Sequence, residues 1–258
     1  MRSSQLDRAL VTNYMKFVAK EPAFWHKNAV IPGERKNALY RDRFMQLFVN
    51  NDVKINIEKS YKKKSFFAVA ARHHYFNRIL LKNIKLDFIK QIIILGAGYD
   101  TRAVNFNNIL SDRMIRVFEV DQPSILTYKE AIYNKNLIDK NAVYLTINYL
   151  CSNLISYFKS HGIDIKLPTY FLWEGNTMYL DKEEMDGILQ MLRGNFQKFL
   201  ISFDYVSNSF LNKQVCNDIS KEDYENFKSK GSPWKNGYDD IQSIAEKYDL
   251  ILLENIRN

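Results

Sequence analysis

Two glycines and one acid stand at a spacing that suits the binding of a nucleoside. Gly96-Ala97-Gly98 directly follows the apolar run 91–95, and Asp121 ends a second apolar run further along the chain. Glycine lets the backbone turn tightly and come close to a ligand. Dinucleotide folds place a ribose-binding carboxylate roughly 20 residues after such glycines. We therefore predict that Asp121 holds a ribose, while Glu119, by strand alternation, points elsewhere.

The residues around the glycines weigh against a pyrophosphate group. Thr101 occupies the position of the third glycine in a G-x-G-x-x-G motif, and the bulky Tyr99 follows Gly98. NAD and S-adenosylmethionine both contain an adenosine ribose, but only NAD carries a pyrophosphate, beside which the third glycine allows close packing. The loop therefore favours S-adenosylmethionine, and a nicotinamide-dependent oxidoreductase stays as the alternative.

The amino-acid tail of S-adenosylmethionine carries a carboxylate that needs a cation. Arg72 lies on a helix predicted before the glycine loop and could offer a bidentate guanidinium fork. The pattern alone favours a simpler interpretation, a surface arginine on an amphipathic helix.

Alternating strands and helices after residue 86 must position these residues. Short β-branched or aromatic runs predict strands at 91–95, 115–120, 142–147, 170–173, 199–203 and 250–253. Pro123 fits the first position of a helix, and Asp181 and Glu184 fit a capping box. The alternation predicts an α/β fold with a mostly parallel, doubly wound sheet. Ligands of such sheets bind beyond the carboxyl ends of the strands, which brings residues 174–179 to the edge that holds the glycine loop.

The first 85 residues have helical periodicity and contain no convincing strand. Apolar residues recur at helical spacing in three predicted helices, at 5–18, 40–49 and 66–83. We expect a single domain over residues 1–258, with a helical cap formed by 1–85 and a Rossmann-like core formed by 86–258.

Composition narrows the class of protein. With 46% apolar and 26% charged residues the chain is expected to be globular. It has two cysteines and no C-x-x-C pair, so we expect no disulfide framework, no metal site and a cytoplasmic location. No apolar run approaches the ~20 residues that span a bilayer, and the start lacks a secretory signal. The net charge of +8 is scattered apart from Lys62-Lys63-Lys64, which we interpret as a solvated turn and not as a nucleic-acid contact.

Four segments resemble motifs of the leucine carboxyl methyltransferase family, in that family's order. They are QIIILGAGYDTR at 91–102, FEVDQP at 118–123, FLWEGNTMYL at 171–180 and GSPW at 231–234. The resemblance spans most of the chain, although the N-terminal region departs most from the family. It implies a Rossmann-like methyltransferase core with a helical N-terminal cap, and S-adenosyl-L-methionine as the cofactor.

The resemblance also implies roles for individual residues. Arg72 would hold the methionine carboxylate, Asp121 the ribose, and Glu174 the methionine ammonium or the transfer site. Asn148 stands where the family has an aspartate, and its amide oxygen can still accept a hydrogen bond from the adenine amino group. The expected cofactor residues are Arg72, Gly96, Ala97, Gly98, Asp121, Gln122, Asn148, Tyr149 and Glu174.

The resemblance implies transfer of a methyl group to oxygen and leaves the acceptor open, on a small molecule or a protein terminus. An acceptor carboxylate is ionised at neutral pH and needs no base. A hydroxyl needs one, for which His73, His74 and Asp204 are candidates. A cofactor-binding module without catalysis is a further alternative.

Overall fold

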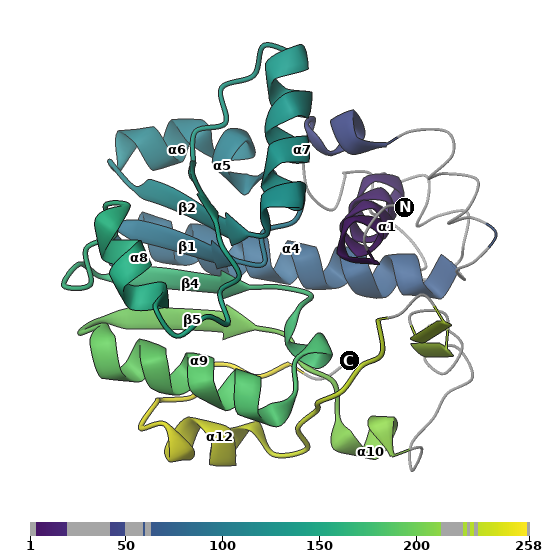
Figure 1. Cartoon of the computed structure of the whole chain (residues 1–258), viewed down its shortest axis with the longest axis vertical. Coiled ribbons are helices and arrows are strands. Elements are labelled where there is room, and N and C mark those ends of the chain that lie inside the picture. The colour runs from purple at the N-terminus through teal and green to yellow at the C-terminus, as the bar shows by residue number, and fades with distance from the viewer. Residues whose placement is uncertain are drawn as a thin grey trace.

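The computed structural model describes residues 4–19, 42–49, 59, 63–212, 224–225, 228–229 and 232–256. Its centre is a five-stranded sheet in the order β3-β2-β1-β4-β5, in which every neighbouring pair is parallel (Figure 1). The strands are β1 (Gln91–Leu95), β2 (Arg116–Asp121), β3 (Val143–Thr146), β4 (Thr169–Trp173) and β5 (Phe199–Phe203). The strand order reverses direction between β1 and β4, where a doubly wound sheet opens a crevice for ligands. The predicted α/β fold is confirmed.

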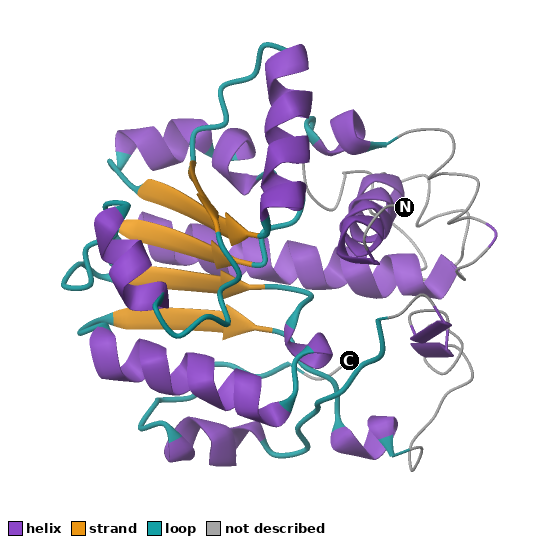
Figure 2. Ribbon diagram, viewed as in Figure 1, coloured by secondary structure: helices purple, strands orange, loops and turns teal. Residues whose placement is uncertain are grey.

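Helices cover both faces of the sheet (Figure 2). Ile92 and Ile94 of β1 point to one face, where they pack in a cluster with Phe76 and Leu80. Ile93 and Leu95 point to the other face and join a cluster that includes residues of the helices after β3, β4 and β5. All five residues of β1 are buried, as they are in β4, because a parallel sheet covered on both faces needs near-continuous apolar strands.

The N-terminal part consists of helices in the described residues. α1 (Ser4–Ala19) packs against α4 (Lys63–Lys85), and a short 3-10 helix, η1 (Met45–Phe48), lies against α1. The first half of α4 contacts α1, whereas its second half packs on the sheet (Figure 1). The division of the chain at residue 85 stays a prediction, because α4 serves both parts.

The helices of the core begin at recognisable signals. They are α5 (Arg102–Asn105), α6 (Asn107–Asp112), α7 (Pro123–Lys135), α8 (Leu154–Ser160), η2 (Thr177–Tyr179), α9 (Lys182–Asn195), α10 (Asn208–Leu211) and α12 (Ile241–Lys247). Pro123 occupies the first position of α7, as predicted. Asp181 and Glu184 form the predicted capping box, in which each side chain accepts from the backbone N–H of the other.

The structure corrects three expectations. Residues 250–253 form no strand: after a left-handed turn at Asp249, Leu250 and Leu252 pack on the core while Ile251 and Leu253 stay exposed. Of the helix expected at 40–49, residues 42–49 contain only the short η1, because Asp42 accepts from the backbone N–H groups of Phe44 and Met45. The lysine run at 62–64 is expected to form a solvated turn, but Lys63 and Lys64 belong to α4.

In the part of the chain that the structure describes, no helix combines the length and apolar character needed to cross a membrane.

Candidate functional site

A cavity of about 350 Å³ opens beyond the carboxyl ends of β1, β2, β3 and β4. Its volume falls within the ~300–1,000 Å³ typical of small-molecule sites. The structure brings together every predicted cofactor residue except Arg72 in its wall, namely Gly96, Ala97, Gly98, Asp121, Gln122, Asn148, Tyr149 and Glu174. The edge at which the sequence predicted a ligand site is therefore hollow.

The glycine loop turns through backbone angles that favour glycine. Gly96 and Gly98 have φ values of +63° and +52°. A Cβ on Gly96 would lie 2.5 Å from Nδ2 of Asn176, whose amide donates to the Gly96 carbonyl at 3.0 Å. A Cβ on Gly98 would make an ordinary contact, 3.5 Å from the Cβ of Ala9. The first glycine therefore allows close packing, and both allow the turn.

Asp121 ends β2 in the wall of this cavity. Its Oδ2 accepts from the N–H of Gly98 at 2.7 Å, and its Oδ1 accepts from the N–H of Gln122 at 2.7 Å. Burial raises the pKa of Asp121, and these two hydrogen bonds counter that shift only in part. The carboxylate is thus locked in one orientation beside the glycine loop.

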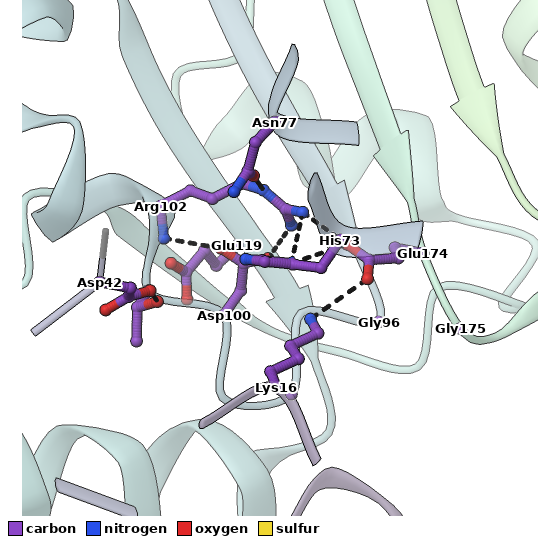
Figure 3. Close-up of polar contacts among 12 residues, drawn as sticks. Lys16, Asp42, His73, Asn77, Gly96, Asp100, Arg102, Glu119, Glu174 and Gly175 are labelled. Atoms are coloured by element: carbon purple, nitrogen blue, oxygen red, sulfur yellow. Dashed lines mark hydrogen bonds and ion pairs between the residues drawn. The ribbon is translucent and has the colours of Figure 1, made fainter. Parts of the chain in front are cut away.

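Glu119 lies outside the cavity wall, as predicted, but strand alternation is not the reason. Residues two apart on a strand share a face, so Glu119 and Asp121 start from the same side of β2. Glu119 is instead held in an ion pair with Lys129 of α7, and both side chains are fully buried (Figure 3 shows the Glu119 end). Burial raises the pKa of Glu119 to about 7.

Glu174, directly after β4, gathers basic groups from three other elements. Figure 3 shows Lys16 and Arg102 beside it. Lys16 of α1 approaches its Oε1 at 3.2 Å, and Nε of Arg72 donates to the same oxygen at 3.3 Å. Nη2 of Arg102 donates to Oε2 at 2.5 Å. Burial alone would raise the pKa of Glu174, but Lys16 and Arg102 hold it well below its usual range.

Arg102 is the buried centre of this network. Its guanidinium also forms an ion pair with Asp100, donates to Oδ1 of Asn77 at 2.6 Å, and lies 2.8 Å from Nδ1 of His73 (Figure 3). Only 3% of the side chain is exposed. Arg102 does not line the cavity, so its role is to hold Glu174 in place.

Arg72 lies beside the cavity and not in its wall. The family resemblance assigns this residue to the carboxylate of the cofactor's amino-acid tail. Its Nη1 donates to Oδ2 of Asp204 at 2.9 Å, in addition to its contact with Glu174. It lines a second, larger cavity of about 1,780 Å³ along β5, as Asp204 does. Lys16 is the cation that lines the first cavity beside Glu174.

Sequence reasoning missed the contribution of α1. Arg8, Thr12 and Lys16 line the cavity, together with Ala9 and Asn13. The three polar residues recur every four positions, so they share one face of the helix. That polar stripe could have been read from the sequence as a second functional face, beside the apolar one.

In the described part of the chain, the two histidines considered as candidate bases are absent from the walls of both cavities. His73 is 1% exposed, and burial together with Lys16 and Arg102 lowers its pKa to about 3. Neither His73 nor His74 lines a cavity, whereas Asp204 does. Among the described residues, no group of three or more His, Cys, Asp or Glu is placed to hold a metal ion.

Known proteins resemble this chain in sequence. The model of the leucine carboxyl methyltransferase family matches residues 18–193. A candidate S-adenosyl-L-methionine-dependent methyltransferase of Streptomyces coelicolor is 24% identical over 169 residues, covering 62% of this chain and 58% of that protein. Another from Mycolicibacterium smegmatis is 30% identical over 127 residues, covering 49% and 39%. The chain thus spans about half the length of the relatives it matches.

Solved structures resemble it in fold. A DUF574 family protein from Streptomyces avermitilis superposes with a TM-score of 0.56 at 13% identity, covering 91% of this chain and 84% of that one. A candidate methyltransferase from Thermobifida fusca gives a TM-score of 0.53 at 16% identity, covering 77% and 73%. At such identities the likeness concerns the fold alone.

Proposed function

This chain belongs to the leucine carboxyl methyltransferase family, and from that premise we propose that it is an S-adenosyl-L-methionine-dependent O-methyltransferase. The observation that carries the proposal is the cavity at the strand edge, where the glycine loop, Asp121 and Glu174 face one space. The acceptor atom is an oxygen, of a carboxylate or a hydroxyl, on a small molecule or a protein terminus.

The residues present fit the parts of the cofactor. Gly96 and Gly98 line the cavity where the methionine portion would lie, and Asp121 is oriented to accept from ribose hydroxyls. Asn148 and Tyr149 line the cavity after β3, where the adenine would lie. Glu174 would accept from the methionine ammonium. Bound there, the cofactor would supply an electrophilic methyl group on a sulfonium centre.

The methionine carboxylate has two candidate cations. The family resemblance assigns Arg72, but its guanidinium is engaged by Asp204 and Glu174 behind the cavity wall. Lys16 lines the cavity and reaches Glu174 from α1. We assign the main contact to Lys16 and a supporting one to Arg72, because a bound ammonium would occupy Glu174 and leave Lys16 to the carboxylate.

The nicotinamide alternative has less support from the loop. Thr101, in the position of the third glycine, is buried, and its hydroxyl donates to Asp42. In a pyrophosphate-binding loop this position is a glycine, which lets the helix pack closely on the strand, and here a threonine side chain stands in its place.

Calorimetric titration tests the proposal. S-adenosylhomocysteine should bind and NAD should not; tighter binding of NAD would contradict the methyltransferase interpretation.

Lys16→Met should weaken the binding of S-adenosylhomocysteine by roughly 2–3 kcal/mol, which lies within the range for a hydrogen bond to a charged group. Arg72→Met should weaken it less, and the exposed Arg78→Met on the same helix should leave it unchanged. A larger loss for Arg72→Met would restore the assignment made from the family resemblance.

A further inference from the structure

The second cavity meets the first at the predicted transfer point. Thr12, Gly175 and Tyr179 line both cavities. Gly175 directly follows Glu174, and its φ of +75° with no side chain leaves room for the Arg72 guanidinium, which a Cβ would approach to 2.9 Å. Because three residues line both cavities, a molecule in the larger cavity could reach a ligand in the smaller one at this junction.

The charges at this junction are already paired. Oδ2 of Asp204 accepts from Arg72 at 2.9 Å, and its Oδ1 accepts from the N–H of Gly175 at 2.6 Å. Arg72 also contacts Glu174. An incoming carboxylate would meet the two carboxylates of Asp204 and Glu174 and would have to displace one of them from Arg72. Like charges that close disfavour ionisation of one another, whereas a hydroxyl can donate its proton to Asp204 without displacing anything.

The walls near the junction are aromatic. Phe203, Tyr205, Phe210 and Trp234 line the second cavity. The rings of Phe210 and Trp234 lie 5.7 Å apart, and those of Phe203 and Tyr205 lie 6.5 Å apart. Rings at these separations present faces and edges on which another ring can stack or pack edge-on. The lining thus favours an aromatic, mostly apolar molecule.

We propose that the second cavity binds the methyl acceptor, that this acceptor is a neutral hydroxyl on an aromatic and otherwise apolar molecule, and that Asp204 takes its proton. The inference rests on the proposed function and decides between the two acceptor chemistries. The hydroxyl oxygen bonds to the methyl carbon, the carbon–sulfur bond breaks with its electron pair left on sulfur, and the proton passes to the Asp204 carboxylate. The products are an ether and a neutral thioether.

The surroundings of Asp204 suit a proton acceptor. Burial raises the pKa of its carboxyl, which makes it a stronger base, while Arg72 and the Gly175 N–H keep it ionised and oriented. Unlike the histidines, it lies at a cavity wall.

Two ring-matched probes test the proposal. Calorimetry on the protein saturated with S-adenosylhomocysteine should give 2-naphthol an affinity at least about tenfold above that of 2-naphthoate, a difference of about 1.4 kcal/mol. Tighter binding of 2-naphthoate, or binding of neither probe, overturns the proposal. Failure of S-adenosylhomocysteine to bind is a separate result, which would contradict the proposed function and not the choice of acceptor.

A charge-neutral variant tests whether Asp204 causes the preference for 2-naphthol over 2-naphthoate. Asp204→Asn keeps an oxygen for the Gly175 N–H but removes the negative charge, so the preference for 2-naphthol should shrink by at least about tenfold, and methylation of 2-naphthol should be lost. Asp239→Asn is the matched control: Asp239 lines the same cavity and accepts from Ser209, away from the junction, and should leave the ratio unchanged. An unchanged ratio in Asp204→Asn would overturn the role of this residue.

Discussion

Asp121 and Glu174 are both half-buried carboxylates at strand ends beside β1, and both line one cavity, yet their pKa values shift in opposite directions. Asp121 is held by two backbone N–H groups, and burial raises its pKa. Glu174 is held by Lys16, Arg72 and Arg102, and its pKa falls well below the usual range. The two neutral donors offset the cost of burying the Asp121 charge only in part, whereas the cations around Glu174 more than offset it.

The largest effect is expected from removing Arg102, a cation that contacts Glu174 but not Asp121. Arg102→Met removes the cation that Glu174 and Asp100 share in a buried network, so the free energy of unfolding should fall by about 3–5 kcal/mol. Urea denaturation followed by circular dichroism measures it. Arg78→Met, which breaks an exposed pair with Glu254, should cost at most about 1 kcal/mol. Equal losses in the two variants would show that Arg102 is not the centre of the network.

A pH series should separate the two carboxylates by sign. Glu174 has a lowered pKa in the folded state, so its contribution to stability is present above pH ~4.5 and is lost as the pH falls. Asp121 has a raised pKa, so its contribution is present below pH ~4 and is lost as the pH rises.

Relative to wild type, Glu174→Gln should therefore be most destabilised at pH 7 and approach wild type on acidification. Asp121→Asn should improve relative to wild type as the pH rises from 4 to 7. Each unit of pKa difference contributes about 1.4 kcal/mol. Unfolding free energies measured from about pH 2 to pH 7 cover both transitions, and parallel curves for the two variants would contradict the contrast between the two residues.

The smallest expected effect comes from a comparison of Gly96, on the Glu174 side of the cavity, with Gly98, on the Asp121 side. Gly96 packs against Asn176, which also donates to the Glu174 carbonyl, whereas the N–H of Gly98 donates to Asp121. Both alanine variants carry the cost of a left-handed backbone, about 1–2 kcal/mol. Gly96→Ala should lose about 1 kcal/mol more stability, because its Cβ must also displace Asn176. Thermal denaturation compares the pair; a greater loss for Gly98→Ala would contradict the packing described.

The sequence predicted the five paired strands because each is a short run rich in aliphatic, β-branched or aromatic residues. Of these strands, β1 and β4 are buried throughout, whereas β3 is mostly exposed or half-buried and β5 is half-buried. It failed at 250–253, where Leu250 and Leu252 satisfy their apolar character by packing on the core without entering the ladder. It also missed short helices such as α5 and α6, which pack by a few residues and have no capping side chain to announce them.

For the site, spacing along the chain predicted the glycine loop and Asp121, whose partners are local in the fold. The network around Glu174 joins α1, α4 and α5, segments whose approach only the folded structure reveals. Arg72 illustrates the limit: its residue type was right for a carboxylate, but a second carboxylate, Asp204, competes for it.

The position of α1 bears on the order in which the molecule assembles. Arg8 donates to Ser232 across 224 positions of the chain, and Lys16 pairs with Glu174 in the middle. Closing so long a loop carries an entropic cost that is met only once the sheet exists. During synthesis α1 can therefore complete its contacts only after the segment around Ser232 has been made, and a ligand that fits only the closed cavity would stabilise the docked α1.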